Sequence, residues 1–430
     1  MKLKEILMFS KKFNQKERGV FYILITFFIL FLLFRLISGN FYLADSYEYL
    51  DTAKRIQNLS FFNSNTSVPF STKRPFVYPL FLSIFYNLPV LVSIIFQTLI
   101  GIFTFFIILK ILKKFNFEIK KSYLWLFLFT PSIYIYTQLL VSEWAVMFFV
   151  TLIFWVLIQK WSSKNFAYIQ ILTILLSFTK PVFYPLIYLN FIFFGIYFIV
   201  NKKFSFWLFI PIIILQSYMT CNEVKTGYKH FSSIENINLI NYNLYYFKSK
   251  TESEVKADLW LDSIYNSKFD NKNFKEQNTY LHDIAIKEIK QNFFQYSYYH
   301  LYTSLRGVFD PGRFDLMTFF KKEDGSQGLL ETLNKNKSIF NLLKNKYSFV
   351  FVLLIPVFLT ILVKWYYLLK YLFLKKLEFK TYYIIVLLAS YILITGPVNA
   401  SRYMMPFQGV IIIFSVLGMS INNDKKIGSN

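Results

Sequence analysis

The chain has 430 residues, of which 55% are hydrophobic, 21% aromatic and 17% charged. A soluble domain carries roughly 25% charged residues, so this composition excludes an ordinary soluble globular protein. The formal net charge is +23. The lysines and arginines gather in short segments between apolar runs, which is typical of membrane orientation and does not favour a nucleic-acid partner.

Ten apolar runs predict an all-α polytopic membrane protein with about ten transmembrane helices. The first run follows a lysine-rich N-terminus and is too long for a signal peptide, so we expect it to be retained. The expected spans cover about 19–38, 89–112, 122–137, 141–160, 166–178, 182–200, 204–220, 348–368, a ninth run ending near Gly396-Pro397, and 403–421.

Lysine pairs such as Lys113-Lys114 and Lys202-Lys203 end alternate spans and mark the cytoplasmic side. The first outside loop is then 39–88, and a polar segment, 221–346, forms a soluble extracytoplasmic insertion of about 125 residues. It separates an N-terminal membrane module, 1–220, from C-terminal membrane helices, 347–430. The residue bias favours an AT-rich bacterial genome, and hence the bacterial cytoplasmic membrane.

The first outside loop begins with an acidic stretch in which Asp45, Glu48 and Asp51 lie within seven residues. If it is helical, Asp45 shares one face with Tyr49. One interpretation is a solvated, acidic start of an interfacial helix. The other is a general base held at the bilayer surface. A second short helix, rich in proline, is expected near Tyr78 at the same interface.

This topology brings charged residues from five parts of the chain to the extracytoplasmic face. Besides the acidic stretch they are Lys73-Arg74, Glu143, Lys180 and Arg402. Taken singly, such residues can be membrane anchors. Taken together, they suit a lipid-linked phosphosugar, because arginine and lysine bind phosphate while an opposing carboxylate deprotonates an acceptor hydroxyl.

Four motifs in order resemble the GT-C superfamily of membrane glycosyltransferases, of the family-39-like type that includes protein mannosyltransferases and the aminoarabinose transferase of lipid A. The motifs are Asp45-Ser46-Tyr47-Glu48-Tyr49 with Ala53, Lys73-Arg74-Pro75-x-x-Tyr78-Pro79-Leu80, Leu140-Val141-Ser142-Glu143, and Ser401-Arg402-Tyr403-x-x-Pro406.

The resemblance implies that Asp45 is the catalytic base and that Arg74, with Lys73, Lys180 and Arg402, meets the donor phosphate. Many relatives have a second acidic residue directly after the first, where this chain has Ser46; Glu48 is the substitute to consider. The resemblance also implies inversion at the anomeric carbon and no metal. The three histidines show no metal-ligand spacing, and Cys221 is the single cysteine, so we expect neither cofactor nor disulfide.

A late part of the insertion contains Asp310-Pro311-Gly312-Arg313, which is typical of a turn. Either it joins interfacial helices, or Arg313 or Asp310 faces an acceptor cavity. The leading hypothesis is a glycosyltransferase that moves a sugar from a polyprenyl-phosphate donor to a hydroxyl of a lipid, glycan or protein outside the cytoplasm. The alternatives are a polysaccharide polymerase or ligase and a flippase for lipid-linked glycans; the sequence does not indicate the oligomeric state.

Overall fold

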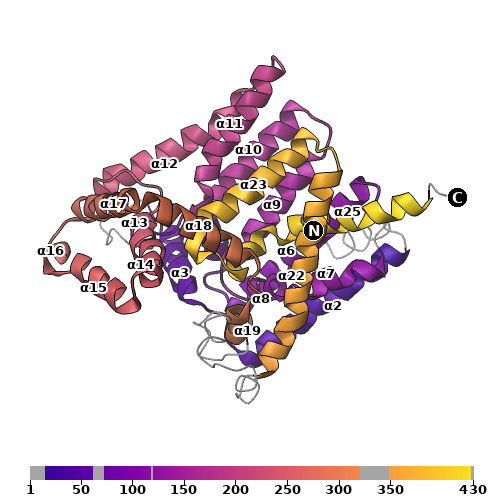
Figure 1. Cartoon of the computed structure of the whole chain (residues 1–430), viewed down its shortest axis with the longest axis horizontal. Coiled ribbons are helices and arrows are strands. Elements are labelled where there is room, and N and C mark those ends of the chain that lie inside the picture. Colours follow the sequence, from indigo (N-terminus) through magenta and orange to yellow (C-terminus); the bar gives the residue numbers. More distant parts are fainter. Residues whose placement is uncertain (1–14, 62–71, 118–119, 320–347, 428–430) are drawn as a thin grey trace.

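The computed structural model describes residues 15–61, 72–117, 120–319 and 348–427, and every regular element within them is a helix. Long helices pack side by side, and a group of shorter helices lies at one side of them (Figure 1). Over the described residues the chain is therefore an all-α protein, as the apolar runs predict.

Six helices are long and apolar enough to cross a membrane, and all six coincide with predicted spans. An integral membrane protein follows from them. They are α2 (Gln15–Ser38), α6 (Val90–Lys114), α11 (Pro185–Val200) with the 3₁₀ turn η2 (Pro181–Phe183) before it, α22 (Ser348–Leu374), α23 (Phe379–Thr395), and α25 (Gln408–Ile427) with the short α24 (Ser401–Met404) and η6 (Met405–Phe407) before it.

The other four predicted spans correspond to shorter helices, so the number ten stays a prediction. The run 122–137 is divided between α7 (Leu124–Leu128) and α8 (Pro131–Thr137), because Pro131 begins a new helix after Thr130, whose backbone is not helical. The remaining three runs contain α9 (Glu143–Leu157), α10 (Ser163–Ser177) and α12 (Ile210–Thr226), which have 15, 15 and 17 residues.

The core of the membrane region lies around α9 and α25. Helix α9 packs against α6, α10 and η6, and α25 packs closely on α22. Where α25 crosses α22, a Cβ atom on Gly418 would overlap the backbone carbonyl of Tyr367, so only glycine permits this close approach. In the apolar stretch of the last span, which contains α25, 83% of the residues are buried inside the protein. Helix α25 is therefore a central element and not a lipid-facing one.

Residues 39–88, predicted to be the first outside loop, contain the two expected helices, α3 (Ala44–Gln57) and α5 (Val77–Ile84), which pack on each other. Helix α3 buries the side that carries Ser46, Tyr49 and Ala53, a spacing of three to four residues. Residues 62–71 between the two helices lie outside the described residues, and a membrane-surface position for either helix stays a prediction.

The segment after α12 folds into α13 (Glu235–Asn238), α14 (Tyr245–Thr251), α15 (Glu254–Ile264), α16 (Ser267–Asp270), α17 (Phe274–Gln291), α18 (Phe293–Val308) and α19 (Arg313–Phe319). The π-helix η4 (Leu239–Leu244), α14 and α17 share a hydrophobic cluster that includes Ile240, Phe247 and Leu281. Helix α18 then packs on α23, and α19 packs on α8. Residues 320–346 lie outside the described residues, and the placement of 221–346 outside the cytoplasm stays a prediction.

Candidate active site

Helix α3 presents Asp45 and Glu48 beside the buried face that packs on α5. Its first turn is held by a hydrogen bond of 2.9 Å from the backbone N–H of Leu43 to Ser46 Oγ. With Ser46 used in this way and buried, Asp45 and Glu48 are the two carboxylates that this turn offers to neighbouring segments. Asp51, one turn later, pairs with Arg55 of the same helix at 3.0 Å and lies apart from the site.

Arg74 joins both carboxylates of α3. Its Nη2 lies 2.8 Å from Asp45 Oδ1 and 2.6 Å from Glu48 Oε2, and its Nε donates to Glu48 Oε2 at 2.7 Å. Lys73 forms an ion pair with the other oxygen of Glu48. The guanidinium carbon of Arg74 also lies 4.9 Å from the centre of the Tyr49 ring, a distance typical of a cation–π contact.

Arg402 connects Asp45 to Glu143 at the start of α9. Its Nη2 donates to Asp45 Oδ2 at 2.5 Å, and its Nε donates to Glu143 Oε1 at 2.6 Å. Lys180 donates to the same oxygen of Glu143 at 3.0 Å, and its Nζ lies 4.7 Å from the centre of the Tyr403 ring. Glu143 thus holds two cations that come from segments far apart in the sequence.

These contacts form one continuous ion-pair chain of alternating sign, in the order Lys73, Glu48, Arg74, Asp45, Arg402, Glu143 and Lys180. All seven were predicted site residues. Counting Lys73, Arg74, Lys180 and Arg402 against Asp45, Glu48 and Glu143 gives four positive and three negative groups, an excess of one positive charge.

The ion-pair chain runs from partly exposed groups to fully buried ones. The side chains of Lys73, Glu48 and Asp45 are 28%, 24% and 29% exposed, whereas that of Glu143 is 0% exposed. A carboxylate at such depth needs paired charges, and Lys180 and Arg402 supply them. A ligand approaching from solvent would therefore meet Asp45 and Glu48 before it met Glu143.

The two arginines control the charge of Asp45. Burial by itself would raise the pKa of this carboxyl, but the positive charges of Arg402 and Arg74 outweigh burial and hold the pKa below its usual value. Asp45 is therefore ionised at neutral pH, and a proton would bind to it only weakly while both guanidinium groups remain in place.

The two predicted tyrosines, Tyr49 and Tyr78, are buried next to the ion-pair chain. Tyr49 and Tyr78 pack edge to face with ring centres 4.8 Å apart. Tyr49 Oη lies 2.8 Å from Ser142 Oγ, next to Glu143, and burial raises the pKa of Tyr49 to about 12, so the hydroxyl stays protonated. Tyr78 Oη donates to Gln97 Oε1 of α6 at 2.9 Å. Both rings join α3 and α5 to the membrane helices.

Arg313 is placed differently from the other predicted residues. It is buried at the first position of α19, and the ion-pair chain does not include it. Its neighbour Asp315 instead reaches the site indirectly, since it accepts hydrogen bonds from Tyr136 Oη and, at 2.6 Å, from Ser401 Oγ. Asp315 was not predicted, because hydrogen bonds between residues 136, 315 and 401 follow from tertiary packing and leave no local pattern.

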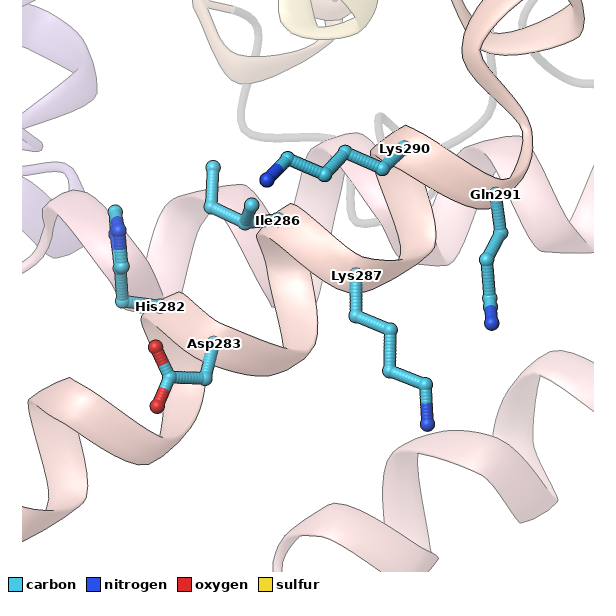
Figure 2. A pocket seen from close by; sticks show the side chains of 6 residues that line it. All are labelled: His282, Asp283, Ile286, Lys287, Lys290 and Gln291. Carbon is cyan, nitrogen blue, oxygen red and sulfur yellow. The ribbon is translucent and has the colours of Figure 1, made fainter.

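A surface hollow on α17 is a poorer candidate. Its six lining residues all project from this one helix, as Figure 2 shows. His282 and Asp283 lie at one end of it and Lys287, Lys290 and Gln291 at the other. One helix face cannot enclose a substrate, whereas the ion-pair chain joins five segments of the chain.

Within the described ranges, no group of three or more His, Cys, Asp or Glu side chains could hold a metal ion. The three carboxylates of the ion-pair chain are paired with cations instead. Comparisons with protein-family models, with curated proteins and with solved structures found no match. The family resemblance of the four motifs therefore stays a prediction.

Proposed function

We propose that the protein is an integral-membrane glycosyltransferase that moves a sugar from a polyprenyl-phosphate donor to an acceptor hydroxyl outside the cytoplasm. One observation carries the proposal, namely the position of Asp45 between the guanidinium groups of Arg74 and Arg402. A carboxylate between two phosphate-binding side chains has the arrangement that such a transfer needs.

The donor phosphate would compete with carboxylates for the arginines. Arg74 and Arg402 each bridge two carboxylates, so either guanidinium can bind a phosphate oxygen while keeping its contact with Glu48 or Glu143. Phosphate would then replace Asp45 as a partner. With its two cations engaged elsewhere, Asp45 would recover proton affinity and become able to act as a base.

In the proposed reaction Asp45 takes the proton of the acceptor hydroxyl while that oxygen attacks the anomeric carbon of the sugar. The bond from the anomeric carbon to the phosphate oxygen breaks, and its electron pair leaves with the polyprenyl phosphate. Arg74 and Arg402 stabilise the charge that grows on the phosphate. A single displacement of this kind inverts the configuration at the anomeric carbon.

One observation favours the flippase alternative. Lys364 lies buried within the span α22, where its ammonium group donates to Thr130 Oγ1 at 2.7 Å and to Gln408 Oε1 at 2.9 Å. A buried cation inside a membrane helix is typical of transport pathways. The predicted site residues, however, gather at the ends of helices, as a surface reaction on lipid donors requires. A polymerase or ligase would share this site and differ in its acceptor.

The deciding experiment uses purified protein in detergent, without an ion gradient, and a short-chain polyprenyl-phosphate sugar. A transferase releases polyprenyl phosphate and forms a glycosidic bond to an added acceptor, and the Asp45→Asn variant does not. Transport of the intact lipid across proteoliposomes, without cleavage by either protein, would refute the proposal and support the flippase.

A further inference from the structure

The beginning of the segment 221–346 holds the backbone that carries Lys73 and Arg74. Ser232 Oγ donates to the carbonyl of Lys73 at 2.7 Å, and the N–H of Ser233 donates to the carbonyl of Thr72 at 3.2 Å. The ring Nε2 of His230 lies 3.0 Å from Thr72 Oγ1. All three are buried, so these hydrogen bonds are shielded from water.

The end of the described part of the same segment holds the backbone that carries Arg402. Asp310 Oδ2 accepts from the N–H of Ser401 at 2.9 Å, and Asp315 Oδ2 accepts from Ser401 Oγ at 2.6 Å. The other oxygen of Asp315 binds Tyr136 Oη, and the Tyr136 ring centre lies 5.9 Å from the guanidinium carbon of Arg402. Asp315 thereby contacts the residue before Arg402 and the ring beside its guanidinium group.

Two glycines permit this close approach. Gly312 has φ +80°, and a Cβ atom on it would lie 2.7 Å from Ser401 Oγ and 2.8 Å from Asp315 Oδ2. A Cβ on Gly307 would overlap the backbone carbonyl of Asn399. The side-chain amide of Asn399 also donates to the carbonyl of Ser304 at 2.6 Å. The sequence Asp310-Pro311-Gly312-Arg313 connects α18 to α19. Because Gly312 has no side chain, this connection can lie directly against Ser401.

We propose that the two ends of this segment are positioning elements for the two arginines that flank Asp45. His230, Ser232 and Ser233 hold the backbone before Arg74, and Asp310 and Asp315 hold Ser401 before Arg402. The segment thereby sets the gap between the guanidinium groups in which a phosphate is bound. The consequence for catalysis rests on the proposed function, whereas the coupling between the segment and the ion-pair chain does not.

The geometry explains why both ends are needed. Arg74 and Arg402 lie 328 positions apart (402 − 74) and meet at one carboxylate, Asp45. An error of about 1 Å in either guanidinium group can cost about a hundredfold in rate when a reaction depends on orientation. Neither 72–74 nor the four-residue α24 is long enough to fix itself, so each depends on hydrogen bonds from elsewhere.

The first test needs no substrate. Thermal unfolding in detergent is measured for Ser401→Ala, Asp45→Asn and the double variant. If Ser401 positions Arg402 against Asp45, the losses in melting temperature do not add, because Asp45→Asn removes the ion pair with Arg402 that Ser401 supports. Additive losses overturn the proposal. Ser263→Ala, which removes an exposed hydroxyl bonded to its own helix, is the matched control and should add to Asp45→Asn.

The second test measures donor kinetics with a short-chain polyprenyl-phosphate sugar. Ser401→Ala and Ser232→Ala should each raise the donor KM about tenfold, with a smaller change in kcat. Replacement of either serine by threonine keeps the hydroxyl and should restore the wild-type KM. Asp315→Asn serves as a third variant if either serine variant folds poorly. An unchanged donor KM in folded variants overturns the positioning role. An inactive wild-type protein with non-additive melting temperatures would refute the transferase and leave the coupling established.

Discussion

Arg402 Nη2 and Asp45 Oδ2 lie 2.5 Å apart, although 357 positions separate the two residues in the chain. The same guanidinium group donates through Nε to Glu143 of α9. One arginine therefore connects helix α3, the core helix α9 and the start of the last membrane helix.

Replacement of Asp45 by asparagine should lower kcat about 10²- to 10⁴-fold, the usual contribution of a general base. The amide keeps the size of the side chain but cannot take a proton from the acceptor. The measurement is polyprenyl phosphate released per enzyme. Asp51→Asn is the matched control, because Asp51 pairs with Arg55 on the same helix and lies apart from the site, so this variant should retain the wild-type rate. Equal rates for Asp45→Asn and wild type would exclude Asp45 as the base.

Replacement of Arg74 by lysine should raise the donor KM about tenfold. Lysine keeps the charge but lacks the fork with which Arg74 reaches Asp45 and Glu48 together. Arg55→Lys, which alters a pair within one helix, should leave KM unchanged. A donor KM that is insensitive to Arg74→Lys would show that the phosphate binds elsewhere.

Glu143→Gln should destabilise the protein strongly, because Lys180 and Arg402 would lose a fully buried counter-charge. Removing one partner from a buried ion pair costs about 3–5 kcal/mol. Differential scanning fluorimetry in detergent measures the change in melting temperature. Glu252→Gln breaks an exposed pair with Lys248 and should have almost no effect. A wild-type melting temperature for Glu143→Gln would contradict the buried pairing.

Stability should decrease as the pH rises from about 4 to about 7. Burial raises the pKa of Asp315 to about 7, although hydrogen bonds from Ser401 and Tyr136 oppose the effect, and burial raises the pKa of Glu235 to about 7. Over that interval the native protein binds protons that the unfolded chain has released, so ionisation favours unfolding. Asp45 has the opposite sign, since its lowered pKa removes stability only below about pH 4.

The measurement of this pH effect is the melting temperature between pH 5 and pH 8 for wild type and Asp315→Asn. The variant cannot ionise at position 315, so its melting temperature should decrease less steeply with rising pH. Asp310 and Arg402 also influence the charge of Asp315, but Arg402 stays ionised throughout. An equally steep decrease in the variant would show that Asp315 does not titrate in this range.

Gly312→Ala should destabilise the turn that contacts Ser401. The positive φ costs an L-residue about 1–2 kcal/mol, and the added methyl group would crowd Ser401 and Asp315. Gly195→Ala in α11 is the control, because its Cβ would meet nothing within 4 Å and alanine favours a helix. A melting temperature for Gly312→Ala equal to that of the control would contradict the described contact.

The sequence predicted which charged residues come together better than it predicted the helices that carry them. Glu143, Lys180 and Arg402 were assigned to one face by alternating the direction of successive spans. That assignment depends on positions at helix ends and tolerates errors in helix length. The apolar composition of 122–137 did not predict its division, but Pro131 is a signal for it, because a proline inside an apolar run ends or kinks the helix before it.

The sequence also did not predict which side chains pair with each other within the site. The acidic stretch did not indicate that Glu48 would be held by Lys73 and Arg74, or that the turn after α18 would reach Ser401. Such contacts depend on how separate segments pack in three dimensions, and the residues that they join lie 25, 26 and 91 positions apart. For Glu143 the sequence predicted the type of partner, since a carboxylate one turn inside an apolar helix must have a cation near it, but not which cation would pair with it.

The excess of one positive charge in the ion-pair chain has a consequence for charge balance during the proposed reaction. A sugar–phosphate–polyprenyl diester carries one negative charge, so its binding would make the assembly neutral. When Asp45 gains the acceptor proton, the seven groups rise to a net charge of two, and the departing phosphate monoester rises to two negative charges. The sum stays at zero from bound substrate to products, and no uncompensated charge forms beside the membrane. A diphosphate-linked donor would not balance in this way.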